Sequence, residues 1–330
     1  MGEALVDLVI ALDGSIRPYL GGGPYNTART LGRLEVPVAF LGRVSDDSFG
    51  RQILARLAID GVSTTLVVPT TDPTTLAVAT LDERGAATYR FYFEGTSVPG
   101  MTPEMAATQL PDAIDALHVG TLALVLEPFA DAVESVLRDL DEDTLVFVDP
   151  NIRPSVIADR RAYLTRLARV LAHADVVKVS DDDLAWISPG VAPEEAARAM
   201  LNNGPNNGPN NGPNNGPNNG PNNGPNNGPN NGPGDGPSVV LLTMGERGVL
   251  VVTPAAADVV EAPAVEVVDT IGAGDSFAGG VLAWWHDHGR PDLTERSVAI
   301  AATTFGCLVA AATVATAGAN PPRRSELAPS

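Results

Sequence analysis

Cysteine is almost missing from this sequence, because Cys307 is the only one among 330 residues. An internal disulfide is therefore impossible, and so is a zinc site built from several cysteines. The N-terminal stretch "MGEALVDLVIALDG" also lacks the basic segment that begins a signal peptide. Both absences fit a reducing compartment, and we expect a cytoplasmic protein.

Basic residues are scarce as well. The chain has 21 Lys and Arg against 40 Asp and Glu, which gives a formal net charge of −19. Such a surface repels nucleic acids and anionic membranes, so we expect neither as a partner. A phosphate-bearing ligand would need backbone amides, a metal cation or an isolated Lys or Arg.

Large apolar residues are few in the one long stretch without charge, residues 297–322. Alanine and threonine dominate it, which is typical of a helix buried against its neighbours rather than of a membrane span. We therefore expect a core helix here.

Apolar runs of about five residues alternate with helical patterns along most of the chain. This alternation predicts a single α/β domain over residues 1–330, with a central, mostly parallel sheet and helices on both faces. The predicted strands lie at 37–45, within 115–124, and at 144–149, 175–180, 238–243, 248–253 and 265–268. The predicted helices lie at 47–61, 129–140, around 163–171, and at 193–201, 274–288 and 294–316.

Two segments depart from this alternation. Residues 8–20 and 74–93 are typical of exposed strands, and the second predicts a hairpin that turns at 82–85. They form either a small β lid or an extension at the edge of the main sheet, and the sequence favours neither.

Residues 202–233 are eight copies of Asn-Asn-Gly-Pro, and "GDGP" follows at 234–237. Proline at every fourth position excludes a helix, and the tract has no apolar residue with which to build a core. The segment 202–237 is therefore predicted to be a disordered surface loop between a helix and a strand.

The stretch "VVDTIGAGDSFAGG" (267–280) places glycines between a predicted strand and a predicted helix. The amides of residues 272–275 would lie at the positive end of the helix dipole and form an anion hole. Asp275 would lie inside it, where a carboxylate can accept a proton from an attacking hydroxyl. The alternative is that Asp275 only caps the helix. Neither a phosphate-loop motif nor a dinucleotide fingerprint occurs, which argues against a nicotinamide-dependent oxidoreductase.

The wording of several segments resembles the ribokinase-like carbohydrate kinases of the phosphofructokinase-B type. "DTIGAGDSFAGG" is similar to their C-terminal signature, and "GGGPYNTARTLGRL" (21–34) and "LGRVSDDSFG" (41–50) to their N-terminal segments. "DPNIRP" (149–154), "KVSDDDLAWI" (178–187) and "ATAGANPP" (315–322) resemble the bacterial fructokinase branch most. The resemblance implies a ribokinase-like α/β fold with a small β lid.

The resemblance also implies a role for individual residues. From the residues alone, Asp7 could equally be a polar strand end, Gly22 and Gly23 a turn, and Asn26 an ordinary helix residue. The family motif implies Asp275 as the catalytic base with an anion hole of Gly272, Ala273 and Gly274; sugar contacts by Asp7, Gly22, Gly23 and Asn26; and nucleotide contacts by Lys178, Thr243, Gly245, Gly272 and Gly274.

Some positions depart from the family pattern. Asp183 stands where relatives often have a glutamate that supports hydrated Mg²⁺, and it is the one predicted metal contact, through water. Phe93 replaces a lid arginine, which weakens the case for an acidic sugar such as 2-keto-3-deoxygluconate.

Asp269 and Ile271 match a loop that in some relatives holds a monovalent cation such as K⁺.

We therefore predict an ATP-dependent sugar kinase that uses Mg²⁺ and phosphorylates a primary hydroxyl, with fructose as the first choice of substrate. The alternatives are a kinase for 2-keto-3-deoxygluconate, ribose or a nucleoside, or a catalytically weak sugar-binding regulatory protein. The expected partners are the sugar and ATP, and the sequence leaves open whether the protein forms a homodimer.

Overall fold

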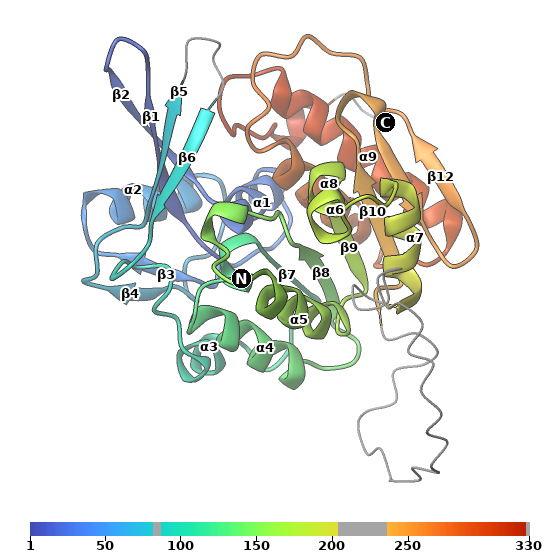
Figure 1. Ribbon diagram of the computed structural model, residues 1–330, viewed down its shortest axis with the longest axis horizontal. Coiled ribbons are helices and arrows are strands. Elements are labelled where there is room, and N and C mark those ends of the chain that lie inside the picture. Colours follow the sequence, from blue (N-terminus) through green and yellow to red (C-terminus); the bar gives the residue numbers. More distant parts are fainter. Residues whose placement is uncertain (82–86, 204–235, 328–330) are drawn as a thin grey trace, which may run out of the picture.

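The computed structural model describes residues 1–81, 87–203 and 236–327. Its main sheet has six strands in the order β12-β11-β10-β9-β8-β7 (Figure 1). Neighbouring strands from β7 to β10 run parallel, whereas β11 and β12 are antiparallel to their neighbours. The mostly parallel sheet is therefore as predicted. The strands are β7 (Ala116–Gly120), β8 (Leu145–Asp149), β9 (Val176–Ser180), β10 (Val239–Thr243), β11 (Val249–Val252) and β12 (Ala257–Val260).

Helices cover both faces of this sheet. Val146 and Val148 of β8 belong to a core that includes residues of α4, α5 and α7, whereas Phe147 belongs to a second core with α8 and α9. Alternate residues of a strand point to opposite faces, so β8 supplies both cores. The helices are α1 (Gly23–Arg33), α2 (Ser48–Ile59), α3 (Pro103–Gln109), α4 (Phe129–Asp139), α5 (Arg160–Leu171), α6 (Asp181–Ile187), α7 (Pro193–Asn203), α8 (Ala273–Asp287) and α9 (Arg296–Val314).

The uncharged stretch near the C-terminus forms α9. By length and composition alone it is apolar enough to cross a membrane, with a mean hydropathy of 1.9. It packs along α8 and against β11 and β12, and nearly half of its apolar window is buried. This placement is that of the core helix expected from its small side chains.

The two exposed segments form a separate sheet with the strand order β2-β1-β5-β6. We call it the small sheet, and Figure 1 shows it projecting beside the main one. Its strands are β1 (Leu5–Ile10), β2 (Ile16–Gly21), β5 (Leu76–Leu81) and β6 (Ala87–Tyr92). The alternative of an edge extension of the main sheet is therefore wrong. The predicted turn at 82–85 lies outside the described residues.

Two predicted strands are wrong or too long. The run 37–45 is mostly irregular, and only β3 (Arg43–Ser45) pairs regularly, with β4 (Val68–Thr70). Residues 265–268 form no strand. Val267 and Val268 are each 59% exposed, so their β-branched side chains do not mark a buried strand as the pattern suggested.

The Asn-Asn-Gly-Pro tract begins within the last turn of α7, which ends at Asn203, and β10 resumes at Val239. Residues 204–235 lie outside the described part of the chain, so the predicted disorder of 202–237 stays a prediction.

Candidate active site

The parallel strands of the main sheet end at one edge, where the chain makes unusual turns. Thr121, just after β7, and Asn151, two residues after β8, both have a positive φ, of 53° and 39°. Such backbone conformations are costly for residues other than glycine and concentrate at functional sites. A methyl group on Gly23, the first residue of α1, would lie 2.6 Å from Thr121 Oγ1 and 3.3 Å from Asn151 Nδ2. The first turn of α1 therefore meets these strand ends.

Asp275 lies at the same place, in the first turn of α8. Gly272 caps this helix with a left-handed φ of 77°, which glycine adopts without strain. Asp275 Oδ2 accepts a hydrogen bond from Asn26 Nδ2 at 2.9 Å, and no backbone amide within the described residues bonds its carboxylate. The carboxylate is thus held by another helix, α1, as well as lying in the first turn of α8.

The backbone around Asp275 has the geometry of an anion hole. Within the described residues, the amides of Gly274 and Asp275 donate to no protein acceptor. These amides lie at the positive end of a 15-residue helix. The strand predicted to precede this turn is missing; instead the amides of Val268 and Asp269 donate to Val314 O of α9.

Burial sets the charge state of Asp275. The side chain is 9% exposed, and this burial raises its pKa to about 6. The hydrogen bond from Asn26 and the nearby charges of Lys178 and Arg153 oppose the rise, whereas Asp149 adds to it. A carboxylate with this pKa is ionised at neutral pH and still basic enough to accept a proton.

A buried ion pair lies beside the anion hole. Lys178 Nζ is 3.0 Å from Asp149 Oδ2, and both residues are buried. A methyl group on Gly274 would lie 2.8 Å from Lys178 Nζ, so the ammonium group is next to the free amides. Burial alone would lower the pKa of Lys178, but Asp149 and Asp183 raise it above its ordinary value. A positive charge is thus fixed where an anion would bind.

The small sheet brings Asp7 to this edge of the molecule. Asp7 of β1 pairs with Tyr19 of β2 and Ala77 of β5, so these three side chains share one face. Burial raises the pKa of Asp7 to about 6, and Arg153 opposes the rise. Arg153 also lowers the pKa of Asp275, so its positive charge acts on both carboxyl groups.

Arg153 is a residue to which the sequence analysis assigns no role, although it belongs to the segment "DPNIRP" that carries part of the family resemblance. The available signal was its position four residues after the end of β8, because side chains just beyond parallel strands gather at the same edge.

The other predicted sugar residues lie where α1 begins. Gly22 caps α1 with a φ of 116°, and a methyl group there would lie 2.5 Å from Glu3 O. Only glycine fits this close approach of two chain segments. Asn26, one turn further along, is already engaged with Asp275.

The predicted nucleotide residues occupy the neighbouring strand end. Thr243 closes β10 opposite Ser180 of β9, and Gly245 turns the chain into β11 with a φ of 59°. Ala273 is the first residue of α8. Thr243 and Gly245 thus lie at the end of β10 in the six-stranded sheet. The anion-hole turn begins α8, one of the helices that cover this sheet.

Asp183 has a different surrounding from the one expected of a metal contact. Its Oδ1 accepts from Ile152 N at 2.7 Å, and its Oδ2 accepts from the amide and the hydroxyl of Ser180. Both oxygens are therefore used to hold the loop after β8 and the start of α6. In the described ranges, no group of three or more His, Cys, Asp or Glu is arranged to hold a metal ion. The contact of Asp183 with hydrated Mg²⁺ therefore stays a prediction.

The loop of Asp269 and Ile271 is tied to the C-terminal segment. Asp269 Oδ1 accepts from Ile271 N at 3.0 Å, and Oδ2 accepts from Gly318 N at 2.9 Å. Ala319 packs directly on Gly272. The segment "ATAGANPP" therefore supports the anion-hole turn from outside.

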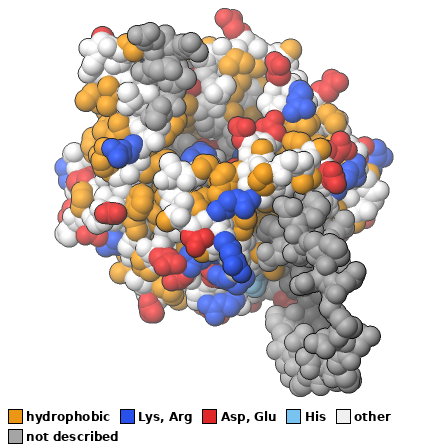
Figure 2. Space-filling view, in the orientation of Figure 1, with side chains coloured by type: hydrophobic (Ala, Val, Ile, Leu, Met, Phe, Trp, Pro, Cys, Tyr) orange, Lys and Arg blue, Asp and Glu red, His pale blue; other side chains and the backbone are white. Residues whose placement is uncertain are grey.

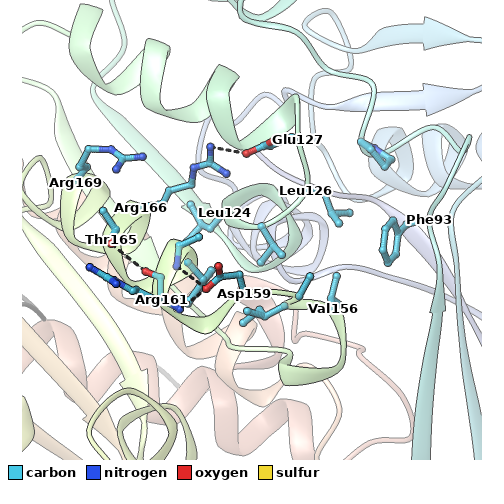
Figure 3. A pocket seen from close by; sticks show the side chains of 16 residues that line it. Phe93, Leu124, Leu126, Glu127, Val156, Asp159, Arg161, Thr165, Arg166 and Arg169 are labelled. Carbon is cyan, nitrogen blue, oxygen red and sulfur yellow. Dashed lines mark hydrogen bonds and ion pairs between the residues drawn. The ribbon is translucent and has the colours of Figure 1, made fainter.

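A cavity lies elsewhere, between α4, α5 and the chain after β6 (Figure 3). Its volume is about 670 Å³, and none of the predicted catalytic, sugar or nucleotide residues lines it. Arg166 is paired with Glu127, Asp131 and Glu134, and Arg169 is paired with Glu134. Figure 2 shows basic and acidic side chains near one another on this side of the molecule. The charges of Arg166 and Arg169 are thus balanced by carboxylates of the protein itself.

Comparison with known proteins gives a consistent result. Residues 2–207 and 231–326 match the family described as pfkB family carbohydrate kinase. A fructokinase of Rhizobium leguminosarum bv. trifolii is 32% identical over 286 residues, which are 86% of this chain and 77% of the relative. The structure of Vibrio cholerae O395 fructokinase with fructose, ADP and calcium has a TM-score of 0.76 and 25% identity, and covers 96% of this chain and 92% of its own. A double mutant of that enzyme with fructose, ADP and potassium has a TM-score of 0.77, 25% identity and the same coverage.

Proposed function

This chain belongs to the pfkB family of carbohydrate kinases and is an ATP-dependent sugar kinase, and we propose that fructose is its substrate. The observation that carries the proposal is the position of Asp275, a buried carboxylate beside free helix amides and next to Lys178. The fructose in the related Vibrio enzyme supports the choice of sugar.

The reaction follows from the charges at this site. Ionised Asp275 takes the proton of the primary hydroxyl as the hydroxyl oxygen attacks the γ-phosphorus of ATP; the bond between this phosphorus and the β-phosphate oxygen breaks, and ADP leaves. The amides of Gly274 and Asp275, together with Lys178, stabilise the negative charge on the phosphoryl group as it moves. Magnesium bound to ATP supplies further positive charge, which the acidic protein lacks.

The sugar is placed against the small sheet. Asp7 accepts hydrogen bonds from sugar hydroxyls, because a carboxylate can bind two neighbouring hydroxyls at once. Tyr19 lies on the same face of the sheet as Asp7, and strand register puts Tyr89 there too. Tyr89 is also near enough to Asp7 for that carboxylate to raise its pKa, although burial is the larger cause. The sugar-binding face of the small sheet therefore carries one acid and two aromatic rings.

The test is an ATP-consumption screen with fructose, 2-keto-3-deoxygluconate, ribose and a nucleoside. Fructose should be consumed well ahead of the others, with a D275N variant as the blank. Equal rates with 2-keto-3-deoxygluconate would contradict the argument from Phe93. Sugar binding without ATP consumption would favour the regulatory alternative.

We also propose that a monovalent cation such as K⁺ binds at the loop of Asp269 and Ile271. The hydrogen bonds of Asp269 to Ile271 and Gly318 fix this loop, and potassium in the related double mutant supports the choice of ion. Measuring turnover in potassium against a tetraalkylammonium salt tests it. Equal turnover in both salts would contradict the proposal.

We propose that the enzyme is a cytoplasmic homodimer formed through the outer face of the small sheet. The register places Leu8, Ile16, Pro18, Val78 and Tyr92 on the face opposite Asp7, and Ile16 and Tyr92 are 60% and 51% exposed. Arg90, opposite Val78, lies on this face too. A mostly apolar face of this kind is suited to a second copy.

Light scattering should give the mass of a dimer for the wild type and of a monomer for I16E. The control is V259E, at an exposed valine on β12. A monomeric wild type would contradict the proposal. The location in the cell is tested by fractionation.

A further inference from the structure

Glu3 is a buried carboxyl group to which the reaction as described assigns no task. It precedes β1, in the segment "GEALVD", and is 1% exposed. Its Oε1 accepts a hydrogen bond from Gly23 N, the first amide of α1, at 3.0 Å. Its Oε2 has no hydrogen-bond partner among the described residues.

The neighbours of Glu3 are the residues of the active site. A methyl group on Gly23 would lie 3.4 Å from Asp275 Oδ1, so the amide that Glu3 holds belongs to a turn next to the proposed base. The backbone oxygen of Glu3 also lies against Gly22, which caps α1. Glu3 therefore contacts both glycines at the start of this helix.

The charged groups that act on Glu3 are Asp275 on α8, Arg153 after β8 and the N-terminal amine of Met1. Burial raises the pKa of Glu3 to about 8; its own backbone amide and that of Gly23 lower the pKa less than burial raises it, Asp275 raises it further, and Arg153 lowers it slightly. Burial lowers the pKa of the Met1 amine to about 5, so that group is neutral at pH 7 and gives no counter-charge.

We propose that Glu3 is a positioning residue that works as a neutral carboxylic acid, holding the first turn of α1 against Asp275 without adding a second negative charge there. The proposal rests on the proposed kinase function for its kinetic consequences. When Glu3 ionises, a buried anion appears beside Asp275 and close to where the phosphates of ATP bind. The rate of sugar phosphorylation should then fall, and the first turn of α1 should become less ordered.

The matched pair of variants is Glu3→Gln and Glu3→Ala. Glutamine keeps the oxygen that accepts from Gly23 N and cannot ionise, so E3Q should have kcat/KM for fructose close to that of the wild type at pH 7. Alanine leaves the buried Gly23 amide without an acceptor, and a loss of about tenfold is expected for one such hydrogen bond. The control is E142Q, at an exposed glutamate between α4 and β8.

The pH profile separates a neutral acid from a merely structural group. Wild-type kcat/KM should fall as pH rises through about 8, where Glu3 ionises, and the E3Q profile should stay flat there. A loss of more than tenfold in E3Q at pH 7 would overturn the proposal. So would an alkaline fall that is the same in wild type and E3Q.

A stability measurement keeps the inference independent of the kinase assignment. The folded-state pKa of Glu3, about 8, lies above its ordinary value of 4.5. Its contribution is therefore complete below pH 4.5 and is lost as pH rises through 8. The Tm of E3Q minus the Tm of the wild type should therefore increase between pH 4.5 and about pH 8 and stay constant above that. A Tm difference that does not change with pH would show that folding does not raise the pKa of Glu3 and would overturn the proposal, whatever sugar the enzyme uses.

Discussion

The side-chain amide of Asn26 donates to Asp275 Oδ2 at 2.9 Å, across 249 positions of the sequence. Thr27, the next residue of α1, donates its hydroxyl to the backbone oxygen of Asp275 at 3.2 Å. Helix α1 therefore holds both the reactive group and the backbone of the proposed base. The direction in which Asp275 points is set by a helix from the other end of the chain.

Replacing Asp275 with asparagine should abolish sugar phosphorylation and leave nucleotide binding largely intact. The amide cannot accept the hydroxyl proton, and losing a general base typically costs about 10²–10⁴-fold in rate. Turnover is measured with saturating fructose and ATP, and nucleotide affinity by calorimetry. D139N, at an exposed carboxylate on α4, is the control. A D275N enzyme with half of its turnover would remove Asp275 from the mechanism.

Replacing Asn26 with alanine should move the acid limb of the kcat/KM profile to higher pH. The wild-type rate should fall below about pH 6, because protonated Asp275 cannot accept another proton. The hydrogen bond from Asn26 lowers the pKa of Asp275, so its loss raises that pKa further. T27V, which removes only the bond to the Asp275 backbone, should leave the limb in place. An acid limb at the same pH in N26A and wild type would contradict the assignment of that limb to Asp275.

Replacing Asp7 with alanine should mainly weaken fructose binding. A hydrogen bond to a charged group is worth about 1.5–3 kcal/mol, so the dissociation constant should rise by about 10–150-fold. D7N keeps one acceptor oxygen and should lose less. Fructose affinity is measured by calorimetry, and unchanged affinity in D7A would move the sugar site away from the small sheet. Because burial raises the pKa of Asp7 to about 6, wild-type affinity should also fall below that pH.

Deleting residues 206–233 should leave sugar turnover unchanged. The family match stops at 207 and resumes at 231, so most of the deleted repeat lies outside the part of the chain that matches the kinase family. Helix α7 and strand β10, which flank it, pack on each other. Loop-closure cost grows by about 0.6 kcal/mol for each doubling of length, so the deletion should raise the free energy of unfolding by roughly 1 kcal/mol. Loss of turnover in the deletion variant would give the repeat a working role.

Much of the fold could be predicted from local patterns. The apolar runs of β8, β9 and β10 fall where strands were expected, because a strand buried on both faces must be apolar at almost every position. The exposed valines at 265–268 carry a similar composition and form no strand. The composition of a segment shows whether it is compatible with a β-strand. Whether it forms one depends on a neighbouring strand with which it can pair.

The sequence by itself determined the family, the alternation of strands and helices, and the glycine turn that leaves amides free before α8. Only the tertiary structure placed Asp275 of α8 against Asn26 and Thr27 of α1, 249 and 248 positions away in the sequence. It also placed Asp7 of the small sheet beside Gly21, next to the glycines that begin α1. The protonation of Asp275, Asp7 and Glu3 depends on burial and on charges from distant segments. Those influences act through space, so no local sequence pattern contains them.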